Sequence, residues 1–447
     1  MTDSVLKDTV NALADKLVVT DLRQPGKVKF PLVPALFAII TAWCSGCNNA
    51  VAVADYLCSK RKILAEVIEG LPANLTMSHD TVLRMLKAVK FSELQSFLSE
   101  FCLRLETYQQ VRESSEKRIL SLDGQTPCAM VYDPVEGAKS PDDRRQYNKL
   151  YYVTLYDSTN KMAIAQDEVA VKENENKSCV RLLKMFSLSG SIVTADALNT
   201  QRSVAKAIIE QDGEYCLAVK ENHKKLLKAI RLAFECSDDE YTPMLNAEKL
   251  DDFETYLRTY RTPLELGHGR VEEREIQVLP ADFIKDRVLG EWTEDCECIV
   301  KATTYCYDKK YKLEKEPLVR YYVCSINPED EGIAETIYRA VREHWHIENS
   351  LHWRLDIDFG QDWMQVKSRE YARNRILLNK LALNILTMLQ PEYSKKSEKI
   401  SMRRLMLKLR DDPELAINGI IRYCRTAGQD AGVGCQTRSG RAVVLRA

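Results

Sequence analysis

The stretch RILSLDG, residues 118–124, follows the charged linker VRESSEKR and begins the part of the chain that decides the fold. Its apolar residues predict a strand that ends at Asp123. NKLYYVTLYDSTNKMAIAQDEVAV, residues 148–171, predicts two strands around an Asp-Ser-Thr-Asn turn, and SIVTADAL, residues 191–198, predicts a fourth strand that ends at Asp196. The amphipathic patterns NKSCVRLLKMFSL and SVAKAIIEQDG predict helices before and after that strand, and EYCLAVK predicts a fifth strand.

The order of these elements is therefore three strands, helix, strand, helix, strand, with acids on the first and fourth strands. This order predicts an α/β fold with a ribonuclease-H-like core. Residues 222–335 break the alternation with a helix, an acidic stretch and several strands, which predicts a β-rich insertion. Helical patterns follow at IAETIYRAVREHWHIENSLHW, residues 333–353, and at EYARNRILLNKLALNILTML, residues 370–389.

The first hundred residues have a different pattern. Apolar residues recur at helical spacing from 30 to 108, which predicts an all-helical N-terminal domain. Ser78 is expected to cap a helix that carries Arg84 and Lys87, as in a helix-turn-helix that reads DNA. A helical bundle that only packs against the next domain is an equally open alternative.

Three domains are predicted from these patterns. Residues 1–110 form the helical domain, and residues 111–390 form the catalytic domain with its insertion at about 222–335. Residues 391–447 form a basic C-terminal segment and a Gly-rich tail that is expected to be flexible.

The composition excludes several classes of protein. The N-terminus MTDSVLKDTVNALADKL lacks the apolar region and cleavage site of a secretory signal, so the 14 cysteines are expected to be reduced thiols rather than a disulfide framework. The longest apolar stretch, PLVPALFAIITAWCSGC, is shorter than the ~20 residues of a membrane span and predicts a buried helix. Cys44 and Cys47 within it are expected to be core cysteines, with half a zinc site or a redox pair as the alternative. The formal charge of -1 means that nucleic-acid binding must rest on local patches.

Asp123, Asp196 and Glu348 form the candidate catalytic set. The first two end predicted strands, and Glu348 lies in HWHIENSLHW, residues 344–353. Two acids at one sheet edge and a third from a helix across the sheet provide oxygen ligands for Mg²⁺ or Mn²⁺. Two such ions about 4 Å apart activate a water or a 3′-hydroxyl and stabilise the leaving oxygen of a phosphodiester. The acids therefore predict in-line phosphoryl transfer on nucleic acid.

Six segments of the chain carry a family resemblance: SLDGQT around Asp123, VKENE at 171–175, VTADALNTQ around Asp196, YCLAVKENH at 215–223, LGHGRVEERE at 266–275, and HWHIENSLHWRLDIDFGQD around Glu348. Together they resemble the H-repeat-associated insertion-sequence transposases, DDE-superfamily members often found beside Rhs elements. The N-terminal DLRQPGKVKFPLVPALFAIITAWCSG and LTMSHDTVLRML are similar to that family's associated domain. The resemblance covers about residues 20–390. It implies a ribonuclease-H-like core with a β-rich insertion, a divalent metal, and cleavage and joining at inverted-repeat ends.

The chain also departs from the family pattern. Members usually read DGK and then an arginine after the first Asp, whereas Gln125 and Pro127 stand in DGQTPCAM here, at a place where the pattern implies a backbone-phosphate contact. Related transposases carry Tyr and Arg before the catalytic Glu and a Lys after it. Those places hold Val341, His344 and Leu355, so only the Glu is carried over.

His344, Glu348 and His352 are spaced by four, so a regular helix would place them along one face. The preferred interpretation makes Glu348 a metal ligand, with the histidines contacting phosphate or orienting the carboxylate. A zinc site of two histidines and a glutamate is an alternative, although HExxH is absent. Asp356 and Asp358 are alternative sources of the third acid.

Trp345 and Trp353 are expected to pack in the core rather than to stack on bases.

Local basic groups are the candidates for DNA binding. The segment 395–410 carries seven basic residues against one acid, and KSREYARNRILLNK, residues 367–380, adds five more. Beside a carboxylate site such groups neutralise phosphates, whereas on a solvated face they often have no specific role. The HGR turn either contacts DNA or is only a tight turn between two glycines. The candidates are Arg84, His268, Arg270, His344, His352, Arg373, Arg403 and Arg404.

The sequence is therefore interpreted as that of a metal-dependent DDE transposase. Its expected partner is double-stranded DNA, both element ends and target, with Mg²⁺ or Mn²⁺ as cofactor. A homodimer or larger assembly on DNA is expected because two ends must be held together. No membrane association is expected, and the expected location is the bacterial cytoplasm near the nucleoid. The alternatives are a nuclease or resolvase on the same fold and a relic that binds DNA without cutting it.

Overall fold

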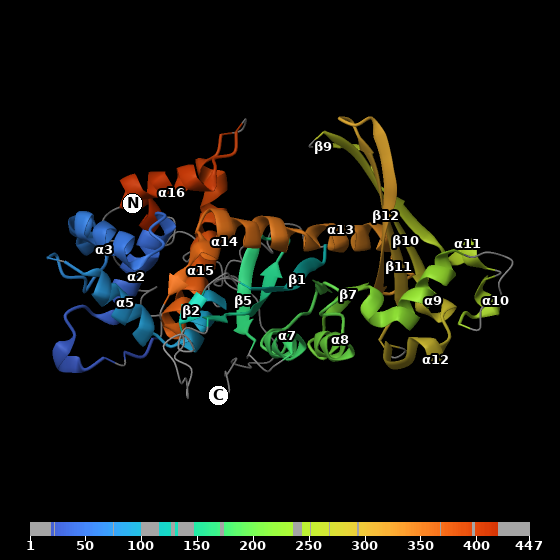
Figure 1. The fold of residues 1–447 in the computed structure, drawn as a ribbon, viewed down its shortest axis with the longest axis horizontal. Coiled ribbons are helices and arrows are strands. Elements are labelled where there is room, and N and C mark those ends of the chain that lie inside the picture. The colour runs from blue at the N-terminus through green and yellow to red at the C-terminus, as the bar shows by residue number, and fades with distance from the viewer. Residues whose placement is uncertain are drawn as a thin grey trace, which may run out of the picture. The chain divides into compact units, whose positions relative to one another are not determined.

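The fold is taken from a computed structural model of the 447-residue chain, shown in Figure 1. It describes residues 19–21, 23–74, 76–99, 116–126, 130–132, 147–169, 174–235, 244–250, 252–267, 269–292, 295–366, 368–395 and 398–418. The chain forms two compact units. Met1–Ser114 and Arg373–Ala447 form the first, here called the helical unit, and Ser115–Ala372 form the second, here called the sheet unit.

The sheet unit is built on one large mixed sheet in the order β5-β4-β1-β6-β7-β12-β11-β10-β8, with β9 paired to β10. β1 is parallel to β6 and β6 to β7, and every other pairing in this sheet is antiparallel. A separate small sheet has the order β13-β2-β3. The strands are β1 (Arg118–Gln125), β2 (Met130–Tyr132), β3 (Tyr147–Lys149), β4 (Tyr152–Asp157), β5 (Met162–Glu168), β6 (Ser191–Ala195), β7 (Glu214–Val219), β8 (Arg258–Arg261), β9 (Glu265–Gly267), β10 (Arg270–Pro280), β11 (Cys298–Asp308), β12 (Leu313–Cys324) and β13 (Gln365–Val366).

The predicted strand order around the two aspartates is present. β1, β4, β5, β6 and β7 follow the predicted sequence, with α7 and α8 on either side of β6 in the chain. The first strand differs in detail, because β1 continues two residues beyond Asp123 and pairs Gly124 and Gln125 with β4. The strands of residues 222–335 extend the same sheet, since β12 pairs with β7.

Helices cover both faces of the sheet, as Figure 1 shows. On one face, Leu120 and Leu122 of β1 belong to the same core cluster as residues of α7, α8 and α9. On the other face, Ile119 of β1 and Ile192 of β6 pack in a cluster with Ile337 of α13. The helices of this unit are α7 (Glu175–Leu183), α8 (Arg202–Ile209), α9 (Lys224–Glu235), α10 (Ala247–Leu250), α11 (Phe253–Tyr256), α12 (Asp286–Leu289), α13 (Ile333–His344) and α14 (Trp353–Ile357).

The helical unit contains α2 (Leu32–Cys44), α3 (Ala50–Ser59), α4 (Arg61–Val67), α5 (His79–Ala88) and α16 (Met402–Asp411), with most of α15 (Arg369–Tyr393). The predicted cap is confirmed, because the Ser78 side chain accepts a hydrogen bond from the Thr81 backbone N–H at the start of α5. α2 is buried along nearly its whole length, as predicted. Cys44 and Cys47 are both buried free thiols, although Cys47 lies beyond the end of α2.

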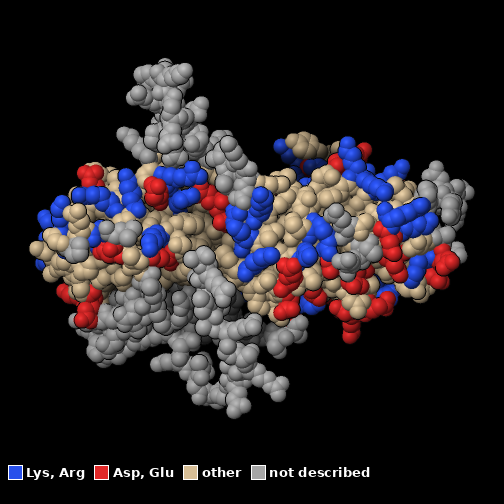
Figure 2. All heavy atoms as spheres, turned by 90° about the horizontal axis from the view of Figure 1, so that it is seen from below, with Lys and Arg blue, Asp and Glu red and all other residues tan. Residues whose placement is uncertain are grey.

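Figure 2 shows Lys and Arg interspersed with Asp and Glu over one face of the described residues, in keeping with a net charge of -1. None of the described helices combines the length and the apolar character needed to cross a bilayer.

Candidate active site

Asp123 and Asp196 lie side by side because of the strand register. β1 and β6 run parallel, and the last pair in their ladder is Leu122 with Ala195. The next residue on each strand is an aspartate. Since neighbouring strands lie about 4.8 Å apart, the backbones of the two acids are adjacent at the carboxyl ends of these strands.

Side-chain alternation directs both acids to the face covered by α13. Ile119 and Ile192 pack against that helix, and residues two and four positions further along a strand point to the same side. Ser121 and Thr194, which are the intermediate positions, contact each other with their hydroxyl oxygens 3.1 Å apart. Asp123 and Asp196 are the next residues on this side.

Glu348 reaches this face from a break in the helix that follows α13. Residues Ile347–His352 form a π-helical turn between α13 and α14. The regular helix predicted through the three residues spaced by four is therefore wrong. Within this turn the Glu348 side chain is exposed, and it lines a pocket of about 110 Å³ with Asp196, Lys220 and His344. π-Helical turns of this kind are frequent at functional sites.

Both predicted histidines contact the strands that carry the aspartates. The His344 Nδ1 atom lies 2.9 Å from the Thr194 hydroxyl oxygen, and the His352 Nδ1 atom lies 3.6 Å from Asp123 Oδ2. Burial lowers the pKa of His344 to about 4, against the opposing effect of Asp196. His344 is therefore a neutral imidazole at physiological pH.

Burial and the neighbouring acids raise the proton affinity of Asp123. Burial, and then the charge of Asp196, raises the pKa of Asp123 to about 7, with Glu348 and Glu175 adding to the rise and the hydrogen bond from the Gly124 N–H opposing it. Asp123 therefore holds its proton more tightly than an isolated aspartate does. No three His, Cys, Asp or Glu side chains within the described ranges converge closely enough to hold a metal ion.

A fourth acid at the site has no predicted role in the sequence analysis. Glu175, at the start of α7, is buried and accepts hydrogen bonds from the Tyr151 hydroxyl at 2.6 Å and from Asn199 Nδ2 at 2.8 Å. Asn199 also donates its side-chain and backbone N–H groups to Asp196 Oδ1. Gly124 leaves room for this network, because a Cβ there would clash with Tyr151 and Glu175. The segments VKENE and VTADALNTQ contain Glu175 and Asn199, but only the fold shows that they meet.

Comparison with known proteins identifies the chain. The family described as Transposase DDE domain matches residues 114–385. The chain belongs to this family. The family described as DDE_Tnp_1-associated matches residues 17–102, so the predicted resemblance is confirmed in both parts of the chain.

Relatives of this DDE transposase include two Escherichia coli K12 proteins. "H repeat-associated putative transposase YhhI" and "Putative protein YbfL" are each 26% identical over 88% of this chain and 92% of their own length. "Putative transposase YncI" of Escherichia coli O157:H7 is 26% identical over 85% of this chain and 88% of its length. Among solved structures, a piggyBac transposase synaptic complex with hairpin DNA aligns at 11% identity and a TM-score of 0.37, over 96% of this chain and 80% of that one.

The alternative third acids of this DDE transposase have other contacts. The Asp358 carboxylate accepts a hydrogen bond from Arg354 at 3.0 Å, and burial and Asp362 raise the pKa of Asp356 to about 6. Neither is among the described residues that line the pocket of Asp196 and Glu348.

The two tryptophans do not share one environment. Trp345 is half-buried, and the Arg320 guanidinium lies 4.9 Å from its ring centroid. Trp353 is 51% exposed, so the prediction that it packs in the core is wrong. The π-helical turn accounts for the difference, because it changes the side to which the residues after it point.

The predicted DNA-binding side chains are scattered over the described residues. Arg84 is exposed on α5, Arg403 and Arg404 are exposed on α16, Arg270 is exposed at the start of β10, and Arg373 is half-buried on α15. Lys380, in the second basic segment, is wholly buried and so is not accessible to a phosphate, and burial lowers its pKa to about 7. Two residues that depart from the family pattern are also described. Val341 lines the pocket of Asp196 and Glu348, and Gln125 accepts a hydrogen bond from Gln361 at 3.3 Å. His268 and Pro127 lie outside the described residues.

Proposed function

We propose that the chain cleaves and joins DNA at the terminal inverted repeats of an insertion sequence, with Asp123, Asp196 and Glu348 as its catalytic acids. The observation that carries this proposal is the register of β1 and β6, which puts two aspartates side by side on the face from which Glu348 approaches. Clustered carboxylates of this kind recur in enzymes that transfer phosphoryl groups between oxygen atoms.

We also infer that the core is ribonuclease-H-like. The antiparallel strands β5, β4 and β1 are followed by the parallel pair β6 and β7, with α7 and α8 in the connections. Parallel strands linked by helices leave their carboxyl ends at one edge, where such folds bind their ligands. Both aspartates lie at that edge.

The chemistry of the three side chains suits a divalent cation such as Mg²⁺ or Mn²⁺, although the carboxylates do not converge on one point among the described residues. All three groups are carboxylates, and burial, together with the charges of Asp196, Glu348 and Glu175, raises the pKa of Asp123. When bound, such ions activate the attacking oxygen and stabilise the leaving oxygen. Asp123, Asp196 and Glu348 would hold them.

The residues around the acids have supporting roles in this proposal. Asn199 holds one oxygen of Asp196 through two hydrogen bonds, which leaves the other oxygen to face a ligand. His344 fixes the end of α13 against Thr194, and His352 lies beside Asp123. Lys220 and Arg320 line the pocket of Asp196 and Glu348 and would bind the phosphates next to the reacting bond.

DNA ends are proposed to be recognised by the helical unit. The capped helix α5 presents Arg84 to solvent, as a recognition helix would. Since two element ends must be joined in one reaction, the active assembly is proposed to be a homodimer or larger.

The proposal is tested on a linear duplex that carries the ends of the encoding element, together with a supercoiled target. With Mg²⁺ or Mn²⁺, the intact chain is expected to release 3′-hydroxyl ends and to join them to the target. Cleavage without joining would assign the chain to the nucleases. Binding without cleavage would assign it to DNA-binding relics, and either result contradicts the proposal.

A further inference from the structure

A groove leads away from the pocket of the acids, across the sheet unit. It has a volume of about 330 Å³ and lies between α13 and the sheet face formed by β10, β11 and β12. Alternate residues of β10 and β12 line it, as expected for one face of a sheet, and β11 contributes Ala302, Thr303 and Thr304. The groove and the pocket of Asp196 and Glu348 share four lining residues, so they are continuous: Arg320, Tyr322, Val341 and Trp345.

Cations without a carboxylate partner follow this path. Lys220 lines the pocket of the acids, Arg320 lines both cavities, and Arg342 and Arg270 line the groove. Within the part of the chain that the structure describes, none of the four forms an ion pair. Arg320 instead lies over the ring of Trp345, an arrangement that leaves its charge available to an anion.

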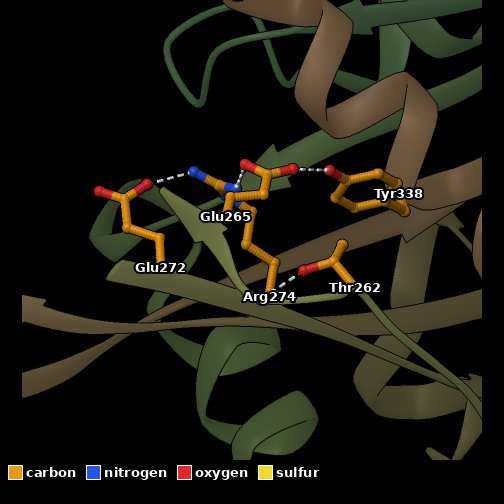
Figure 3. A network of polar contacts seen from close by, with 5 residues as sticks. All are labelled: Thr262, Glu265, Glu272, Arg274 and Tyr338. Carbon is orange, nitrogen blue, oxygen red and sulfur yellow. Dashed lines mark hydrogen bonds and ion pairs between the residues drawn. The ribbon is translucent and has the colours of Figure 1, made fainter. Parts of the chain in front are cut away.

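Arg274, a fifth cation of the groove, is bound in a different way. Figure 3 shows its guanidinium between Glu265 and Glu272, with Glu265 reaching on to the Tyr338 hydroxyl of α13 at 3.5 Å. This network joins β9 and β10 to the helix and offsets the charge of Arg274. The groove therefore contains one arginine that is paired with carboxylates, whereas the four other cations have no such partner among the described residues.

We propose that this groove binds one sugar-phosphate strand of the DNA that extends from the acids, through phosphate contacts from Lys220, Arg320, Arg342 and Arg270. The inference rests on the proposed function and adds to it a binding surface outside the acids and outside the helical unit. Its basis is charge complementarity: unpaired cations in a continuous channel suit a polyanion, whereas a protein partner of ordinary composition would need apolar contacts at the core of the interface.

The sheet register gives the spacing of the two outer contacts. On β11, Ala302 pairs with Arg320 and Asp308 pairs with Arg270, so the two arginines are 308 - 302 = 6 residues apart along the strands. At about 3.4 Å per residue this is about 20 Å. A full turn of B-DNA spans about 34–36 Å, so the two arginines lie within one turn of a duplex and should contact different phosphates.

The test measures binding of the full chain to the element-end duplex in EDTA over a range of salt concentrations. The variants Arg320→Ala, Arg342→Ala and Arg270→Ala are each expected to lower the slope of log K against log salt by about one, because each removes one phosphate contact. Lys301→Ala is the matched control, since Lys301 precedes Ala302 on β11 and points to the opposite face. Arg320→Lys keeps the charge and should restore most of the slope, which separates a lost contact from a lost fold.

Ethylation interference locates the contacts on the DNA. Phosphates whose ethylation blocks binding of the intact chain should lose that effect in Arg320→Ala and in Arg270→Ala, at a different position for each variant. Salt-dependence slopes that are unchanged in all three variants would overturn the proposal that this groove binds DNA. Loss of interference at the same phosphate in both arginine variants would also overturn it. A chain that cuts DNA but shows unchanged slopes rejects only this inference. Altered slopes in a chain that never cuts reject only the proposed cleavage.

Discussion

Gly124, the residue after Asp123, has no room for a side chain, because the hydrogen-bonded side chains of Tyr151 and Glu175 lie against its Cα. A Cβ at this position would clash with the Tyr151 hydroxyl and the Glu175 carboxylate, which are hydrogen-bonded to each other. We expect Gly124→Ala to lower the free energy of unfolding by about 1–3 kcal/mol, the usual cost of overpacking. Urea unfolding measures the change. Gly267→Ala is the control: no atom lies within 4 Å of the added Cβ, and equal losses in both variants would contradict the account.

The raised pKa of Asp123 makes the stability of the metal-free protein depend on pH. Its folded-state pKa of about 7 exceeds the unfolded value of about 3.9, so the folded state binds the proton more tightly. The stabilisation is complete below the unfolded pKa and is lost as pH rises through the folded one. We therefore expect the melting temperature to fall between pH 5 and pH 8 by less in Asp123→Asn than in the intact chain.

The control for this pH effect is Asp252→Asn, because Asp252 is exposed and its side chain makes no capping hydrogen bond. It should keep the full decrease. A decrease that is identical in Asp123→Asn and Asp252→Asn would show that Asp123 does not carry the pH dependence.

Single residues were predictable to different degrees. The adjacency of Asp123 and Asp196 could be predicted from sequence, because each follows a run of apolar residues typical of a strand. The contacts of Glu175 could not, since they join side chains of α7, of Tyr151 just before β4 and of the loop after β6, which meet only in the folded chain. The exposure of Trp353 could not be predicted either, because the sequence does not show whether an aromatic residue of a helix faces the core or the solvent.

At the scale of elements, the π-helical turn Ile347–His352 determines how Glu348 is presented. Such a turn has one residue more than a regular helix would use, so deletion of exposed Asn349 should restore α-helical spacing and rotate the residues that follow. We expect this deletion to abolish metal-dependent cleavage while DNA binding remains. The substitution Asn349→Ala keeps the length and should keep cleavage. If the deletion variant cut DNA as well as Asn349→Ala does, the turn would have no role in the site.

Most elements followed from periodicity, and the irregular ones did not. Strands β1, β4, β6 and β7 have apolar runs bounded by polar turns, so their order was predicted correctly. HWHIENSLHW fits a regular helix equally well, because hydrogen bonds to the fifth residue rather than the fourth leave no mark on composition. Pairing of β12 with β7 is a long-range contact, which local patterns do not encode.

At the scale of the whole molecule, the helical unit combines the two ends of the described chain. Ser45 and Gly46 lie just beyond the end of α2. The Arg410 guanidinium of α16 donates to the Ser45 carbonyl at 3.2 Å, and Met406 of α16 packs against Gly46. A chain that ends at residue 394 should therefore show faster hydrogen exchange in α2 and unchanged exchange in β6, which lies in the other unit. Mass spectrometry of exchanged peptides measures both in one sample. Unchanged protection of α2 would mean that α16 does not stabilise it.

If Asp123, Asp196 and Glu348 form a phosphoryl-transfer centre, conservative variants of these acids should bind the element-end duplex without cutting it. Asp196→Asn and Glu348→Gln keep the shape of each side chain and remove its charge. With Mg²⁺ or Mn²⁺, the intact chain should cut, and both variants should lose cutting by at least about a hundredfold while binding the duplex as well as the intact chain does. Cutting by either variant at the rate of the intact chain would contradict the assignment of the centre to these acids.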